Sequence, residues 1–170
     1  MTLKNAQKYN IFNLIFFLIA VFTSTFILVL ISYYFLGYTP FGNSSLASMD
    51  ADIQYLDLFS YLKDVLNGNN SVIYTFSKGL GGNNIGNYAY YLSSPFNLLV
   101  VLFEKENLPL FFNLIFALKI STCAATMTVF AYCRFGNKYN KTKFRYFSIF
   151  AISISYALCQ YNIAQSSNIM

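Results

Sequence analysis

The sequence predicts an all-α integral membrane protein with three membrane-spanning helices and a large outer loop between the first and the second. Two observations support this fold class. Of the 170 residues, 56% are hydrophobic and only 10% are charged, whereas soluble domains carry about 25% charged residues. The hydrophobic residues also gather in three long runs, and all six acidic residues lie between the first two. A chain this poor in charge cannot cover a water-facing surface, so much of it must face lipid or other protein.

The three runs define the predicted spans. Residues 11–36 are uncharged, and 26 residues form roughly 39 Å of helix, enough to cross a hydrocarbon core of about 30 Å. A cleaved secretory signal has a shorter apolar region, so we expect this span to be retained. The second span covers residues 108–132 and contains one charge, Lys119. The third covers residues 146–170 and is apolar at its start.

The charges between the runs orient the single membrane domain. The tail, residues 1–10, contains Lys4 and Lys8, and the connector, residues 133–145, contains five basic residues and no acid. Basic segments stay on the cytoplasmic side of a membrane. The tail and the connector are therefore predicted to be cytoplasmic, and the acidic loop, residues 37–107, to lie outside. Because the positive charge flanks the spans, nucleic acid is not a predicted partner.

The histidine and cysteine content of the chain excludes two kinds of site. Histidine is absent, and the three cysteines form no C-x-x-C pair. This composition excludes a Cys/His zinc site and catalysis by a histidine base. We expect the cysteines, which lie in apolar surroundings, to behave as small hydrophobic residues.

Part of the outer loop has the periodicity of an amphipathic helix. The apolar residues recur at helical spacing: Ile53, Leu56, Phe59, Leu62, Val65 and Leu66. The pair Asn67-Gly68 suits a helix end. We expect a helix of 14 residues lying on the outer membrane surface. The apolar stretch 95–103 is too short to span and is predicted to be a second interfacial helix or a re-entrant element.

A glycine-rich stretch, residues 74–86, follows this helix. It lacks the Gly-Lys-Ser/Thr of a phosphate-binding loop and the third glycine of a dinucleotide motif. Its glycines would let the backbone turn tightly and approach a ligand. Amide and aromatic residues come next, namely Asn83, Asn84, Asn87, Tyr88, Tyr90 and Tyr91. They suit sugar hydroxyls and sugar rings, or equally an aromatic belt at the membrane interface.

Two features of the spans suggest additional helices. The end of the third span is polar, with Gln160, Asn162 and Gln165. Lys119 lies near the middle of the second span, and no acid lies in any span. A charge at that depth needs a partner, a polar cavity or a route to the interface. We therefore expect this chain to be the N-terminal piece of a longer protein.

Three short motifs occur in order along the loop: Asp50-Ala-Asp-Ile-Gln-Tyr55, Gly79-Leu-Gly-Gly-Asn83 and Tyr90-Tyr-Leu-Ser-Ser-Pro-Phe96. Their order and spacing resemble the start of the bacterial YfhO-like family of multi-pass membrane proteins. The resemblance covers essentially the whole chain. It implies the N-terminal part of a GT-C-like helical bundle in the bacterial cytoplasmic membrane.

Members of that family are similar to glycosyltransferases of the GT-C type. The resemblance implies transfer of a sugar from a polyprenyl-phosphate carrier to a cell-surface polymer, such as lipoteichoic acid, on the outer leaflet. The implied partners are membrane lipid, this donor, this acceptor and the remaining C-terminal part of the protein. Family members have many more spans and an outer C-terminal domain, so we do not expect the 170 residues alone to be active.

Sugar transfer from a lipid phosphate needs a base for the acceptor hydroxyl and positive charge for the departing phosphate. The resemblance makes Asp50 the candidate base, although the residues alone also suit a helix N-cap. Asp52 is a second acid or metal ligand, or a solvated first-turn acid. A divalent cation is compatible with this chemistry, but no ligand cluster demands one, and its ligands are unknown.

Lys78 and Lys119 are candidates for phosphate contact. Lys78 could equally be a solvated loop charge, and Lys119 could pair with an acid on an absent helix. The full set of predicted substrate-binding residues is Gln54, Tyr55, Lys78, Gly79, Gly81, Asn83, Tyr90, Tyr91 and Lys119. Two other classes of function stay open: a lipid or solute transporter or flippase subunit, suggested by Lys119 and the polar third span, and an inactive membrane fragment.

Overall fold

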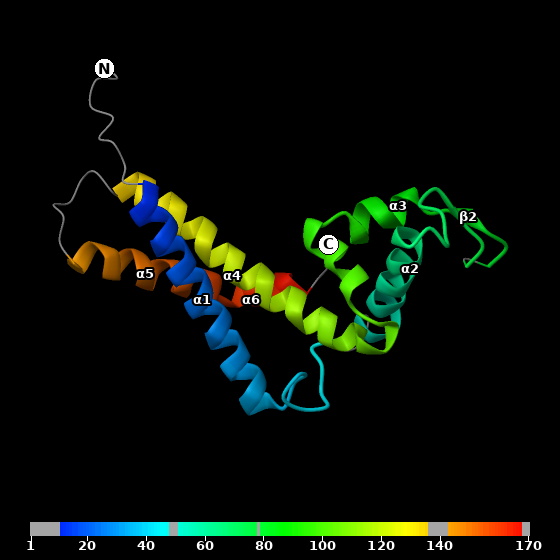
Figure 1. The fold of residues 1–170 in the computed structure, drawn as a ribbon, viewed down its shortest axis with the longest axis horizontal. Coiled ribbons are helices and arrows are strands. Elements are labelled where there is room, and N and C mark those ends of the chain that lie inside the picture. Colours follow the sequence, from blue (N-terminus) through cyan, green and yellow to red (C-terminus); the bar gives the residue numbers. More distant parts are fainter. Residues whose placement is uncertain (1–10, 48–50, 78, 136–142, 168–170) are drawn as a thin grey trace, which may run out of the picture. The chain divides into compact units, whose positions relative to one another are not determined.

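The computed structural model describes residues 11–47, 51–77, 79–135 and 143–167. The chain divides into two compact units: the helical unit, Met1–Ile31 with Ala117–Gln165, and the loop unit, Ser32–Phe116 with Ser166–Met170. Figure 1 shows that the described structure is mostly helical, as the sequence predicts for an all-α protein.

Helix α1 runs over Ile11–Leu36 and has the bounds predicted for the first span. Gly37 follows with φ +69°, a left-handed conformation that ends helices and that glycine adopts without steric cost. Phe12–Leu36 has a mean hydropathy of 2.9. Large apolar side chains along α1 are exposed, including Phe12 at 78% and Phe16 at 71%. This helix is long and apolar enough to cross a bilayer.

Helix α4, Leu108–Phe135, contains the second predicted span and extends three residues further, to include Arg134. It belongs to the apolar helical stretch Lys105–Phe135, whose mean hydropathy is 1.7. This stretch is more buried inside the protein than α1 is. Within the described residues, these two helices are long and apolar enough to cross a membrane.

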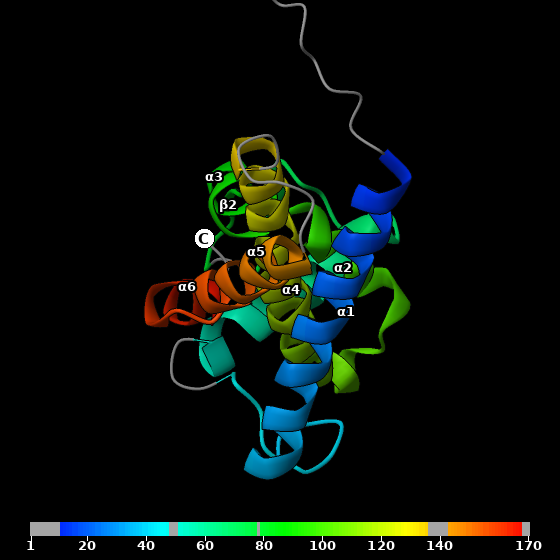
Figure 2. The same ribbon diagram turned by 90° about the vertical axis from the view of Figure 1, so that its left-hand side faces the viewer.

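The region of the third predicted span is not one continuous helix in the structure. The structure has α5 over Lys143–Ala157 and α6 over Gln160–Ser167 (Figure 2, orange and red). The Tyr156 carbonyl explains the break, because it accepts a hydrogen bond from the Asn162 side-chain amide at 2.6 Å and from the Cys159 N–H at 3.3 Å. A side chain that binds a main-chain carbonyl competes with continuous helix. No glycine or proline marks the break in the sequence.

Small buried residues allow close packing in the helical unit. They occur every three or four positions along one side of α4: Ala117, Ser121, Ala124, Thr128 and Ala131. The hydroxyls of Ser121 and Thr128 donate to the carbonyls of Ala117 and Ala124, so they are satisfied within the helix. Small residues let backbones approach closely, which is how helices associate in lipid.

The loop unit begins with helices and a hairpin. The π-helical turn η2, Ala51–Tyr55, leads into α2, Leu56–Leu66. Strands β1, Tyr74–Thr75, and β2, Gly82–Asn83, then pair antiparallel, with Tyr74 opposite Asn83. A short α3, Ile85–Asn87, follows. This hairpin was not predicted, because its strands are only two residues long and two residues give no alternating pattern.

Short helical turns connect α3 with α4. They are the π-helical turn η3, Tyr88–Leu92, and the 3-10 helices η4, Pro95–Leu102, and η5, Lys105–Asn107. The stretch predicted to be a second interfacial helix or a re-entrant element is thus a 3-10 helix, and it contacts α2. Its Val100 is fully buried, whereas Leu102 is 78% exposed.

The predicted amphipathic helix ends where expected, with Asn67 as its C-cap and Gly68 at φ +80°. The α-helix has 11 residues rather than the 14 expected, because Ala51–Tyr55 forms the π-helical turn η2. Its apolar face, however, packs largely against protein. Phe59 is completely buried, and its ring lies 5.1 Å from that of Phe111 at the start of α4. Leu62 is buried in the same core. These two residues therefore pack against protein, and the position of the helix on the membrane surface stays a prediction.

Candidate functional site

A buried amide on α4 holds the segment that follows α1. Asn113 is 1% exposed. Its Nδ2 donates to the Thr39 carbonyl at 3.1 Å and to Thr39 Oγ1 at 2.8 Å. Its Oδ1 accepts from Ser45 Oγ at 3.2 Å and from the Leu46 N–H at 3.0 Å. The Tyr33 hydroxyl donates to the Asn113 carbonyl at 2.9 Å. One side chain thus fixes residues 39–46, just ahead of the predicted catalytic acid.

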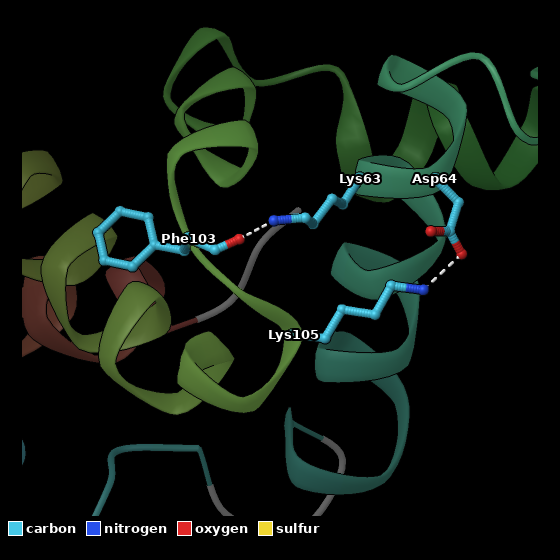
Figure 3. Close-up of polar contacts among 4 residues, drawn as sticks. All are labelled: Lys63, Asp64, Phe103 and Lys105. Atoms are coloured by element: carbon cyan, nitrogen blue, oxygen red, sulfur yellow. Dashed lines mark hydrogen bonds and ion pairs between the residues drawn. The ribbon is translucent and has the colours of Figure 1, made fainter.

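Two polar contacts hold α2 against the segment before α4 (Figure 3). The Lys63 ammonium donates to the Phe103 carbonyl, and Lys105 Nζ lies 2.7 Å from Asp64 Oδ2. The ion pair is partly exposed, with side chains at 48% and 25%, so it contributes about 0–1 kcal/mol. These contacts hold α2 in position beside residues 103–105.

A pocket of about 510 Å³ lies between α2 and the hairpin with α3; we call it the hairpin pocket. Its lining combines amides, hydroxyls and one carboxylate with a few apolar groups: Ile53, Gln54, Asp57, Leu58, Tyr61, Thr75, Ser77, Asn84 and Asn87. All of these residues belong to the loop unit. Asp57 is the one charged residue among the described members of this lining.

The local fold presents the polar groups of the pocket. Asn84 is only 4% exposed. Its backbone is fixed, since its N–H donates to the Ile73 carbonyl at 2.8 Å and its carbonyl accepts from the Tyr88 N–H at 3.0 Å. Its side-chain amide makes no hydrogen bond to the described residues. Thr75, 5% exposed, accepts from the Ser77 N–H through Oγ1 at 3.1 Å.

Tyr61 supplies an aromatic ring to the same lining. Its hydroxyl donates to the Ser71 carbonyl at 2.6 Å, which fixes the half-buried ring. The hairpin pocket therefore combines a fixed aromatic face with amide, hydroxyl and carboxylate groups. Amides and hydroxyls both donate and accept hydrogen bonds, as the hydroxyls of a sugar do.

The two most consequential predicted site residues, Asp50 and Lys78, lie outside the described residues. Asp52 is exposed on η2. Gln54 lines the hairpin pocket, and its role in substrate binding stays a prediction. Tyr55 does not fit that role well, because it is 6% exposed in the apolar core and its ring packs 5.8 Å from that of Tyr91.

The other aromatic and amide residues predicted to bind substrate are not among the described lining residues of the hairpin pocket. Tyr90 is 59% exposed, and its ring meets Tyr91 edge-on at 4.7 Å. Asn83 Oδ1 accepts from the Ile85 N–H at 2.8 Å, which organises the start of α3. Lys119 is half-buried on α4 and belongs to the helical unit rather than the loop unit.

The glycine-rich stretch forms the loop of the hairpin. Gly79 and Gly81 have φ values of +53° and +95°, which are the conformations expected of a tight glycine turn. At Gly81 the backbone lies close to the Tyr74 side chain rather than to a ligand, since a Cβ there would lie 2.3 Å from the Tyr74 hydroxyl. The glycines therefore shape the hairpin that carries Thr75 and Ser77.

Replacing Gly81 with alanine should destabilise this hairpin. The new Cβ would meet Tyr74 in a backbone conformation that L-residues rarely adopt, and such strain costs about 1–3 kcal/mol. We expect faster amide hydrogen exchange at residues 74–83 by mass spectrometry. The matched control is Gly86→Ala, where a Cβ meets nothing within 4 Å. Equal exchange in both variants would contradict the prediction.

Sequence reasoning missed Asp57, Tyr61, Thr75 and Ser77 as pocket residues. Asp57 was visible only as a polar position within the amphipathic pattern, and the hairpin brings Thr75 and Ser77 next to it. Within the described ranges, no three His, Cys, Asp or Glu side chains gather in a way that could hold a metal.

Two long apolar helices joined by a structured polar segment define a helical membrane protein. Residues 17–170 match the family described as bacterial membrane protein YfhO, and the chain belongs to this family. Comparisons with curated proteins and with solved structures give no match. The resemblance found in the three loop motifs is thereby confirmed.

Proposed function

We propose that this chain carries the outer-loop site of a membrane glycosyltransferase. The enzyme would move a sugar from a polyprenyl-phosphate carrier to a cell-surface polymer, such as lipoteichoic acid, at the outer leaflet of the bacterial cytoplasmic membrane. The hairpin pocket carries this proposal, because it places sugar-compatible groups in the segment that joins two long apolar helices. In the proposed topology the N-terminus is cytoplasmic and the loop unit faces outward.

Asp50 is the proposed base. It directly precedes η2, and Gln54 and Asp57 of the hairpin pocket follow four and seven positions later in the sequence. The carboxylate would accept the proton of the acceptor hydroxyl while that oxygen attacks the anomeric carbon. The bond from that carbon to the carrier phosphate then breaks, and the phosphate leaves with the electron pair. Asp52 is the second candidate for this role.

Positive charge would stabilise the leaving phosphate. Among the residues that the structure describes, the lining of the hairpin pocket contains no basic residue. Lys78 of the hairpin loop is our first candidate for this contact, and Lys119 of α4 is the second.

Asp50→Asn in the full-length protein should abolish glycosylation of the polymer at unchanged expression. General-base catalysis contributes about 10²–10⁴-fold in rate, and the amide cannot take the proton. Glycosylation would be measured by NMR of polymer extracted from cells that produce either variant. Asp52→Asn is the matched control and should retain more activity.

Normal glycosylation in the Asp50→Asn variant would refute Asp50 as the base. Movement of a labelled lipid or solute across proteoliposomes without any sugar transfer would favour the transporter alternative over the enzyme.

A further inference from the structure

We infer that the tip of the β1–β2 hairpin inserts into the lipid bilayer and holds the hairpin pocket at the membrane surface. The inserted side chains are those of Tyr74, Phe76 and Leu80, which we call the hairpin tip. The inference does not depend on the proposed transfer reaction, because it concerns contact with bulk lipid rather than with a substrate.

The hairpin tip exposes large apolar side chains. Leu80 is 99% exposed, Phe76 80% and Tyr74 45%. The rings of Tyr74 and Phe76 meet edge-on at 5.1 Å, and the Tyr74 ring lies against Gly81, the neighbour of Leu80 in the chain. Single exposed apolar residues are common, but a cluster of them marks a surface that contacts protein or membrane.

The side chains around β1 alternate in the opposite sense to those of a sheet that faces water. Thr75 is buried and lines the hairpin pocket, whereas Tyr74 and Phe76 on either side of it are exposed. A sheet with one face in water directs apolar residues inward and polar residues outward. The reverse order, apolar outward and polar inward, is found where strands face lipid. This alternation therefore favours lipid over water as the surroundings of the hairpin tip.

The segment that contains the hairpin is almost without charge. Residues 65–103 contain no acid and one base, Lys78, whereas the six acids lie within residues 50–64 and 104–106. In soluble domains about 25% of residues are charged, which would be about ten in a segment of this length. The one charge is positive, and anionic lipid attracts basic interfacial segments. The charge pattern thus suits a lipid surface better than water.

The loop unit is attached to the membrane at both ends, and this makes lipid its nearest partner. The unit includes residues 32–36 at the end of α1 and residues 108–116 at the start of α4. Both helices are long and apolar enough to cross a bilayer. A tethered segment meets its surroundings at a high effective concentration, so the hairpin tip encounters lipid far more often than it encounters a separate protein.

Tryptophan fluorescence of the full chain in lipid nanodiscs tests this insertion. The sequence contains no tryptophan, so Leu80→Trp and Phe76→Trp each create a single reporter. The nanodiscs contain phosphatidylcholine and phosphatidylglycerol in equal parts, with or without acyl chains brominated near the headgroup. Interfacial segments enter about 5–10 Å into the boundary between headgroups and acyl chains, so we expect brominated lipid to quench both reporters about two-fold.

Asp52→Trp is the matched control, because Asp52 is exposed on η2 in the acid-rich part of the loop unit. This reporter should be quenched by iodide in the water phase and not by brominated lipid. Adding Leu80→Asp to the Phe76→Trp protein should abolish most of the lipid quenching, since a charge resists transfer into hydrocarbon. Adding Asn70→Asp, which places the same charge at an exposed position outside the hairpin tip, should leave the quenching unchanged.

Two fluorescence results would overturn the inference. Quenching of the Leu80→Trp and Phe76→Trp reporters by iodide but not by brominated lipid would place the hairpin tip in water. Protection of these reporters from both quenchers would show that protein covers the tip, either a second copy of the chain or another subunit.

Lipid with a photoreactive acyl chain provides a test that needs no substitution. In the same nanodiscs it should crosslink to residues 74–80 of the native chain, as mapped by mass spectrometry. Crosslinks confined to the two long apolar helices would contradict insertion of the hairpin tip. Neither experiment includes a sugar donor, so loss of the proposed transfer activity would leave this inference intact.

Discussion

Replacing Asn113 with leucine should lower the free energy of unfolding by about 2–4 kcal/mol, because it removes the amide that joins α4 to residues 39–46. Four hydrogen bonds of the side chain would be lost. Leucine has a similar volume, so the cost comes from polar groups rather than from a cavity. The Leu46 N–H and the Thr39 carbonyl would then lie beside an apolar side chain without their partner, and such burial is unfavourable.

Denaturant titration in detergent micelles would measure the change in stability, and limited proteolysis would report the loosening of residues 39–47. Ser45→Ala is the matched control, since it removes one half-buried hydroxyl from the same network and should cost about 1 kcal/mol. If the Asn113→Leu variant unfolds at the same denaturant concentration as the native protein, this network contributes little to the free energy of unfolding. The segment leads directly towards Asp50, so the variant should also lose transfer activity.

Local sequence patterns predicted two helix ends correctly, those of α1 and α2. The end of α1 follows from an apolar run that stops before Gly37, and the end of α2 follows from Asn67-Gly68. In each case a residue suited to left-handed backbone ends a clear periodic run. Such signals depend on neighbours in the sequence and need no knowledge of the tertiary fold.

Contacts between distant residues could not be predicted in this way. Asn113 binds residues 67 to 74 positions away, and in the sequence it is only one polar residue in an apolar run. The break between α5 and α6 depends on how the Asn162 side chain meets the Tyr156 carbonyl. Neither case involves glycine or proline, which are the usual signals of an interrupted helix.

The same limit applies to the site. Tyr55 belongs to a motif that suggests a ligand, but the structure buries its side chain in the apolar core. Asp57 belongs to an ordinary amphipathic helix, and it gains a possible ligand-binding role only because the hairpin folds beside α2. Residue type and order therefore indicated the segment of the chain in which the pocket lies, whereas side-chain direction decided which members of that segment line it.

Replacing Phe59 with alanine should destabilise the loop unit by about 3–5 kcal/mol, the usual cost of truncating a buried aromatic side chain. Phe59 is completely buried, and its ring lies 5.1 Å from Phe111 and 6.5 Å from Phe112. The edge-to-face contact with Phe111 adds to the area that is buried. Since α2 also carries Asp57 and Tyr61 of the hairpin pocket, a loosened helix should also disturb the lining of that pocket.

Denaturant titration would again give the free energy, with Ile53→Ala as the matched control. Ile53 belongs to the same apolar periodicity but is 76% exposed in η2, so its truncation should change the free energy of unfolding by less than about 0.5 kcal/mol. Phe59→Leu should fall between the two variants, because it keeps part of the apolar volume. If Phe59→Ala and Ile53→Ala are equally mild, the apolar face of α2 does not pack on α4 in the folded protein, and contact with the membrane surface becomes the better account of that face.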